Sequence, residues 1–343
     1  MLTLDAVAHW GRLRASATNR RVARFSLPSA LCFYPPYLRP RHCGFAEEGW
    51  CTVQRLPFTP ARGRAPIALG LLVTLLATGC TASNDKPKET FSETPFVAAD
   101  FVDPTAGMNK WFPLKPGTQW VREGTTLIGN RTVPHKVVTT VTDVIREVNG
   151  VKTVLLYDRS VGAGQIVQQS LDYYAQDRAG NIWAMGAATE QFEAGRFVAV
   201  DEAWLSGVDG AKAGIQIPAD PTAKTPPWTI ARPPKADGDA AEFLRTQKRE
   251  CVPFACFDNV LVIREGKRSA INNEYKYYAL GVGQIRNEPR GASRHADIER
   301  LINVTKLTPE GLAEASDEAL RIDQQAAREM PKLFGSAKAS RIP

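Results

Sequence analysis

Beyond residue 107, the chain consists of short runs of apolar, β-branched and aromatic residues separated by turn residues such as Gly, Asn and Pro. Runs of this length and composition predict β-strands. The predicted strands cover residues 118–128, 137–148, 151–159, 165–176, 181–185, 196–200, 257–265, 273–279 and 301–307.

One turn between two of these strands carries a strong signal. Asn149 and Gly150 separate two runs that are rich in Val and Thr. Asn-Gly favours a type I′ turn, which needs positive φ at both central residues, so the two runs are expected to form a β-hairpin.

The spacing of the strands predicts a mostly β fold over residues 108–307. Strands about 8–12 residues apart with turn signals between them are typical of an antiparallel meander, folded as an open barrel or a sandwich. The β–α–β alternation of a doubly wound nucleotide-binding fold does not occur in this pattern.

The hydrophobic period changes at the C-terminus, in residues 308–343. Thr308 is a suitable N-cap and Pro309 a suitable first helical residue. Apolar residues then recur at steps of three and four, which predicts an amphipathic helix that ends near Pro331 and Gly335. The stripe consists of Leu312, Ala315, Ala319, Ile322, Ala326 and Met330.

A different apolar segment lies near the N-terminus. Residues 65–77 form an uncharged run that follows several arginines and leads into small residues. A basic region, a short apolar core and small residues together predict a secretory signal peptide over 65–79. The run is too short for a transmembrane helix, which needs about 20 residues.

The residues that end this segment, Leu-Leu-Ala-Thr-Gly-Cys at 75–80, resemble the lipobox of bacterial lipoproteins. The resemblance implies cleavage between Gly79 and Cys80, a diacylglyceryl group on the Cys80 thiol, and acylation of the new α-amino group by a chain such as palmitate. Ala77 stands where the family usually has leucine. Two or three acyl chains give stable membrane anchoring, and the polar, proline-containing stretch 80–107 is predicted to be a tether.

Charge along the chain is uneven. The 343 residues carry a formal net charge of +7, and residues 1–64 account for all of it, with ten arginines against three acidic residues. Residues from 80 onward hold 33 basic and 33 acidic side chains, so charge gives no reason to expect a nucleic-acid partner. Residues 1–64 are either a basic leader or, over much of 1–52, a translated segment upstream of the true start, as the lack of lysine there suggests.

Candidate chemistry is sparse in the predicted mature chain. Cys251 and Cys256 are expected to form a disulfide across a turn that contains Pro253. His135 and His295 have no metal-ligand spacing and are expected at the surface, so neither a metal nor a cofactor is predicted.

Several aromatic residues cluster in the predicted strands. For Tyr173, Tyr174, Trp183, Tyr275 and Tyr277 we expect core packing and cross-strand pairing, and a ligand-binding face is the alternative. The segments 114–120, 172–183 and 274–283 resemble uncharacterised secreted bacterial proteins and lipoproteins, a resemblance that implies no activity.

We therefore expect an extracytoplasmic protein that Cys80 anchors to the cell membrane or outer membrane. Its β domain is expected to bind an apolar small molecule or an envelope protein without catalysing a reaction. At the level of fold it is similar to lipoprotein-carrier half-barrels, by analogy alone. The alternative is a hydrolase acting on cell-wall or carbohydrate substrates with carboxylates such as Asp172, Asp177 and Glu193.

Overall fold

The structure is a computed structural model, and it describes residues 91–342 except 235–236, 268–269, 291–296 and 336. The chain divides into two units, Met1–Cys80 and Thr81–Pro343, and every described residue belongs to the second. The predicted leader, signal segment, cleavage site and lipidation site at Cys80 lie outside the described residues.

Antiparallel strands make up most of the described chain. The elements in chain order are η1 (Ala98–Asp100), β1 (Thr118–Ile128), β2 (Arg131–Val148), β3 (Val151–Gly162), β4 (Gln165–Gln176), β5 (Ile182–Glu193), β6 (Arg196–Leu205), β7 (Lys212–Ile217), β8 (Trp228–Arg232), β9 (Asp239–Cys251), β10 (Cys256–Lys267), β11 (Ala270–Ala279), β12 (Gly283–Pro289), β13 (Ile298–Lys306), α1 (Pro309–Glu329), α2 (Pro331–Phe334) and β14 (Ser340–Arg341).

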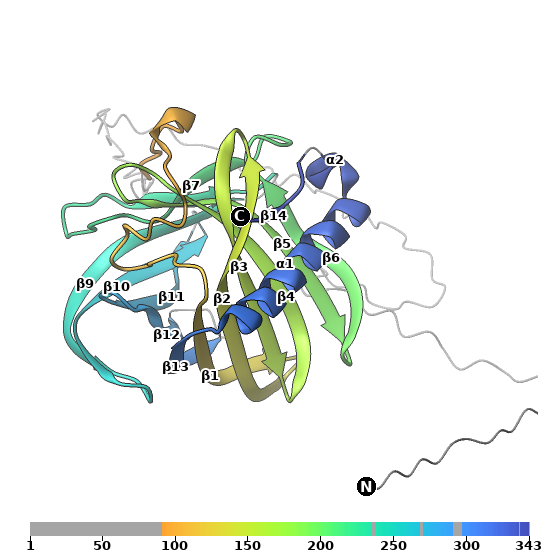
Figure 1. The fold of residues 1–343 in the computed structure, drawn as a ribbon. Coiled ribbons are helices and arrows are strands. Elements are labelled where there is room, and N and C mark those ends of the chain that lie inside the picture. Colours follow the sequence, from red (N-terminus) through yellow and green to blue (C-terminus); the bar gives the residue numbers. More distant parts are fainter. Residues whose placement is uncertain (1–90, 235–236, 268–269, 291–296, 336, 343) are drawn as a thin grey trace, which may run out of the picture. The chain divides into compact units, whose positions relative to one another are not determined.

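Twelve of these strands close into a barrel (Figure 1). Their order is β1-β13-β12-β11-β10-β9-β8-β7-β5-β4-β3-β2, and β2 pairs with β1 to complete the ring. The expected mostly β, antiparallel fold is confirmed, but the expected open barrel or sandwich is wrong because the barrel is closed. Closure depends on β1, which pairs with its hairpin neighbour β2 and also with the distant strand β13.

The predicted Asn-Gly hairpin is confirmed. β2 ends at Val148 and β3 begins at Val151, and these two residues pair with each other. Asn149 and Gly150 have φ values of 50° and 77°, as a type I′ turn requires.

The predicted C-terminal helix is also confirmed. The Thr308 side chain accepts a hydrogen bond from the backbone N–H of Gly311 (3.2 Å) and so caps α1. The helix lies on the outer face of the barrel against β2–β6 (Figure 1). No helix in the described ranges is long and apolar enough to cross a membrane.

Residues 91–103, which belong to the predicted tether, pack on the outside of the barrel. Ser92 forms a bridge with Trp228, and Phe101 forms one with Asp177. The rings of Phe101 and Trp183 meet edge to face with centroids 5.4 Å apart. This stretch is therefore part of the folded body.

Cys251 and Cys256 are joined by a disulfide. The two residues face each other where the β9–β10 hairpin turns, and their Cα atoms lie 4.0 Å apart. The bridge thus closes the turn formed by residues 252–255.

Candidate functional site

The lumen of the barrel is lined by polar side chains. Residues on one face of a strand occupy alternate positions, so every second residue of a strand faces the lumen. On β4, Ser170, Asp172 and Tyr174 line the lumen. Tyr173, which lies between two of them, faces outward and its hydroxyl donates a hydrogen bond to Asp323 of α1 (2.9 Å).

The same alternation on β11 brings charged groups into the lumen. Glu274, Lys276 and Tyr278 line it. The Lys276 ammonium lies 2.7 Å from Glu265 and 3.2 Å from Glu274. Burial lowers the pKa of Lys276, but these two carboxylates outweigh burial and hold the pKa well above its ordinary value, so Lys276 is charged and paired.

Two adjoining cavities of about 740 Å³ and about 260 Å³ are lined by these lumen residues, and the larger one reaches Met330 at the end of α1. They share part of their lining, so they lie side by side. The shared residues are Gln168, Ser170, Asp172, Tyr174 and Gln216. A space of this size is typical of a pocket for a small molecule.

Acidic side chains outnumber basic ones around this space. The lining contains eight acidic residues, which are Asp158, Asp172, Asp201, Glu202, Asp239, Glu274, Asp297 and Glu299. The three basic residues, Arg122, Lys267 and Lys276, are all in ion pairs, with Glu299, Asp239 and Glu274 among their partners. The lumen therefore favours positive charge.

Arg122 organises one wall of the smaller cavity. Its Nε donates to Glu299 Oε2 (2.8 Å) and its Nη2 donates to Thr139 Oγ1 (2.7 Å). The Thr139 hydroxyl in turn donates to Asp158. Burial raises the pKa of Asp158 above its ordinary value, although Arg122 and Thr139 oppose that effect.

Asp172 lies where the two cavities meet. Burial raises the pKa of its carboxyl from 3.8 to about 7, and the neighbouring charge of Asp158 adds to the effect. Lys276 and a hydrogen bond from Tyr174 oppose it. Asp172 has no ion-pair partner among the described side chains, which also holds for Asp158, Asp201 and Glu202 in the same lining, and it is the one of these four that borders both cavities.

Aromatic rings gather at one end of the lumen. Phe112, from the segment before β1, lies among Trp120, Tyr174 and Tyr278, with centroid distances of 6.1, 5.6 and 6.5 Å. All four side chains line the smaller cavity.

Asn109 holds this segment in place. It is fully buried, and its Nδ2 donates to the carbonyl oxygens of Gly180 (2.9 Å) and Pro218 (3.2 Å). Its Oδ1 accepts hydrogen bonds from the backbone N–H groups of Trp111 and Phe112.

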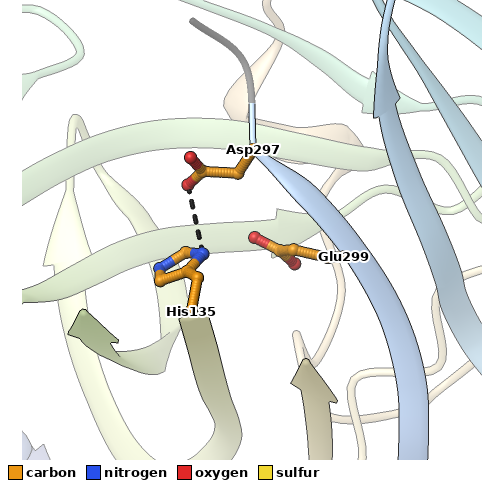
Figure 2. A group of neighbouring side chains, drawn as sticks. All are labelled: His135, Asp297 and Glu299. Carbon is orange, nitrogen blue, oxygen red and sulfur yellow. Dashed lines mark ion pairs between the residues drawn. The ribbon is translucent and has the colours of Figure 1, made fainter. Parts of the chain in front are cut away.

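His135, Asp297 and Glu299 form a second group of side chains (Figure 2). Each offers a ligand atom within 4.8 Å of the others, and His135 Nδ1 lies 3.4 Å from Asp297 Oδ2. The expectation that His135 lies at the surface is wrong, because it is only 5% exposed. His295 lies outside the described residues.

The register of the barrel explains why these three residues meet. Gly124 of β1 pairs with His135 on β2 and with Glu299 on β13. The two side chains therefore flank a strand position that has no side chain. No local motif signals this group, because His135 lies about 160 residues before Asp297 and Glu299 in sequence.

The predicted aromatic face does not form as one surface. Tyr174 lines the lumen, but Tyr173 lies outside beneath the C-terminal helices. Trp183 packs against the N-terminal segment. Tyr275 and Tyr277 are stacked under arginine side chains, on the opposite face of β11 from the three lumen residues.

The three carboxylates suggested for a hydrolase lie apart. Asp172 is in the lumen, whereas Asp177 sits in the β4–β5 turn and accepts a hydrogen bond from Trp183 Nε1 (2.8 Å). Glu193 is exposed at the far end of β5. The chain does not bring this set of carboxylates together.

Comparisons with known proteins identify no relative that explains this site. No family model matches the chain, and no curated protein matches it. One solved structure with some likeness is described as a "putative lipoprotein" from Parabacteroides distasonis. It has 14% sequence identity and a TM-score of 0.26, and the match covers 57% of this chain and 99% of that one. A likeness this weak carries no argument about fold or function.

Proposed function

We propose that this protein is an extracytoplasmic binding protein whose barrel holds a small organic cation, such as an amine. The observation that carries the proposal is Asp172, a carboxylate without an ion-pair partner in the described chain, placed where two cavities meet inside an acidic lumen. A bound ammonium group would supply the missing positive charge.

The surroundings of Asp172 suit an organic cation. The side chains of Tyr174 and Trp204 line the same cavity. Aromatic faces attract ammonium groups through cation–π interactions, by about 0.5–2 kcal/mol. Carboxylates beside aromatic rings thus offer both charge and apolar contact to an alkylammonium ligand.

The lining also changes the class of ligand that we propose. The sequence favours an apolar small molecule or an envelope protein as partner, and that remains a prediction. An apolar ligand inside this lumen would cover carboxylates and amides without replacing their hydrogen bonds to water, which is costly. A polar, positively charged ligand avoids that cost.

Calorimetric titration of the full chain tests the proposal. We expect spermidine or choline to bind and to raise the melting temperature, and we expect glutamate and glucose to have no effect. Asp172→Asn should weaken binding at least tenfold, whereas the control Glu193→Gln, at an exposed position, should leave it unchanged. Binding of neither cation, or equal binding by both variants, would overturn the proposal.

We also propose that the protein is a lipoprotein held at the cell envelope by acyl chains on Cys80. The support is the lipobox-like sequence 75–80 and the apolar run before it. Cys80→Ser should block processing or release the protein from membranes. Unchanged mobility on a gel together with unchanged membrane partitioning would contradict this assignment.

A further inference from the structure

We propose that His135, Asp297 and Glu299 form a zinc site in the lumen. One imidazole nitrogen and two carboxylates lie with their ligand atoms within 4.8 Å of one another (Figure 2). Asp172 lines the same cavity as Asp297 and Glu299 but is not one of the three proposed ligands, and the zinc site does not depend on the binding of an organic cation.

A second observation points to a ligand at this position. His135 is buried, and its Nδ1 has no hydrogen-bond partner among the described residues. The contact with Asp297 Oδ2 at 3.4 Å is longer than a good hydrogen bond. Buried polar atoms are almost always satisfied, so a buried nitrogen that has no hydrogen bond and lies beside two carboxylates suits a metal ion.

The neighbour Asn287 supports the same conclusion. It is buried, its Nδ2 donates to the Asp297 carbonyl (3.2 Å) and to Glu274 Oε2 (2.9 Å), and its Oδ1 has no partner in the described chain. Asn287 therefore holds the backbone of one proposed ligand in position.

The donor set favours zinc over Ca²⁺ and Mg²⁺. Three protein ligands with nitrogen and oxygen donors and one open position for water are typical of non-structural Zn²⁺ sites. Ca²⁺ and Mg²⁺ prefer oxygen donors alone. Tetrahedral zinc places its ligand atoms about 3.4 Å apart, since each bond is about 2.0–2.1 Å. His135 Nδ1 and Asp297 Oδ2 already lie 3.4 Å apart, and the limit of 4.8 Å leaves at most about 1.4 Å for any other pair to close.

Acidic side chains outnumber basic ones near the site, which favours a cation. Arg122 donates to Glu299 Oε2, and Lys276 pairs with Glu274. These two positive groups face the carboxylates of Asp158, Glu274, Asp297 and Glu299, which line the same cavity. Oε1 of Glu299 receives no hydrogen bond from the described residues, so the Arg122 contact orients this carboxylate and leaves one oxygen for the metal.

The test is zinc binding by the full chain after removal of metals with EDTA. We expect calorimetric titration with ZnCl₂ to show one equivalent more for the wild-type chain than for His135→Ala or Asp297→Asn. Asp297→Asn keeps the shape of the Asp297 side chain, which is one-third exposed. Circular dichroism checks that this variant folds as the wild type does. The control Glu193→Gln changes an exposed carboxylate and should bind as the wild type does.

Equal stoichiometry in the wild type and Asp297→Asn would overturn the proposal, and so would a wild-type chain that binds no zinc. X-ray absorption of the zinc-loaded wild type adds a second readout. Nitrogen and oxygen donors including one imidazole are expected, and a sulfur donor would place the metal at cysteines and reject this site. Spermidine should still bind to Asp297→Asn, because the proposed binding of an organic cation depends on Asp172. This titration therefore tests the proposed function independently of the zinc site.

Discussion

Arg146 of β2 and Asp323 of α1 form an ion pair buried between the barrel and the C-terminal helix. Nη1 of the arginine lies 2.7 Å from both oxygens of the carboxylate, and each residue is at most 3% exposed. Nη2 donates to the carbonyl of Phe334 (2.7 Å), and the Tyr173 hydroxyl also donates to Asp323. One charged pair thus links the helices α1 and α2 to the outer wall of the barrel.

Loss of one partner of this pair should be costly. Asp323→Asn leaves the Arg146 charge buried without its counterion, and we expect the free energy of unfolding in urea to fall by about 3–5 kcal/mol. Asp258→Asn is the matched control, because Asp258 pairs with Arg249 at 3.5 Å on the exposed surface. That change should cost less than about 1 kcal/mol, and similar losses in the two variants would contradict the assignment.

Asp172 should make stability depend on pH. Its pKa is about 7 in the folded chain against 3.8 ordinarily, so the folded state binds the proton more tightly. The resulting stabilisation is present below about pH 4 and is lost as the pH rises to about 7. Because cavity water reduces the effect, we expect the stability of the wild type relative to Asp172→Asn to fall by roughly 1–3 kcal/mol between pH 4.5 and 8.

Urea unfolding of both proteins at the two pH values measures this difference. Asp158 and Asp297, whose pKa values burial also raises, titrate in both proteins, so most of their effect cancels in the comparison. A difference that stays constant with pH would show that Asp172 is solvated like a surface carboxyl.

The features predicted correctly from the sequence are those with local signals. The hairpin depends on two adjacent residues, Asn149 and Gly150, and the helix on an N-cap at Thr308 with a stripe of period 3.6. Closure of the barrel has no such signal, because Gly124 meets Glu299 from a strand about 175 residues away. Non-local pairing of this kind is set by the twist and register of the whole sheet.

The candidate site was only partly visible in the sequence for a related reason. Strand alternation already places Asp172 with Tyr174 and separates both from Tyr173. It does not say which face is the lumen, because helices and the segment 91–103 bury much of the outer face of the barrel as well. Core packing of the aromatic residues is confirmed for Tyr173, Trp183 and Tyr277, whereas the alternative of one ligand face fails because the barrel divides these residues between its two sides.

The disulfide should contribute modestly to stability. Cys251 and Cys256 close a loop of only six residues, for which loop-closure entropy gives about 2 kcal/mol. Dithiothreitol should lower the free energy of unfolding of the wild type in guanidinium chloride by about that amount. The double variant Cys251→Ser/Cys256→Ser should already have lost it and should be insensitive to the reductant. An equal effect of dithiothreitol on both proteins would assign the loss to other cysteines.

Gly124 should tolerate even a single methyl group poorly. A Cβ there would lie 1.8 Å from the carbonyl oxygen of Ile298, so β1 and β13 would have to separate where they close the barrel. We expect Gly124→Ala to lower the free energy of unfolding by about 3 kcal/mol or more, at the upper end of overpacking effects. The control is Gly311→Ala in the first turn of α1, where the nearest atom would be 3.6 Å away. Alanine favours helix by up to about 1 kcal/mol over glycine. Gly311→Ala should therefore stabilise the protein or leave its stability unchanged, whereas Gly124→Ala should destabilise it. A loss of less than 1 kcal/mol at Gly124 would mean that the barrel is not closed by this close contact between β1 and β13.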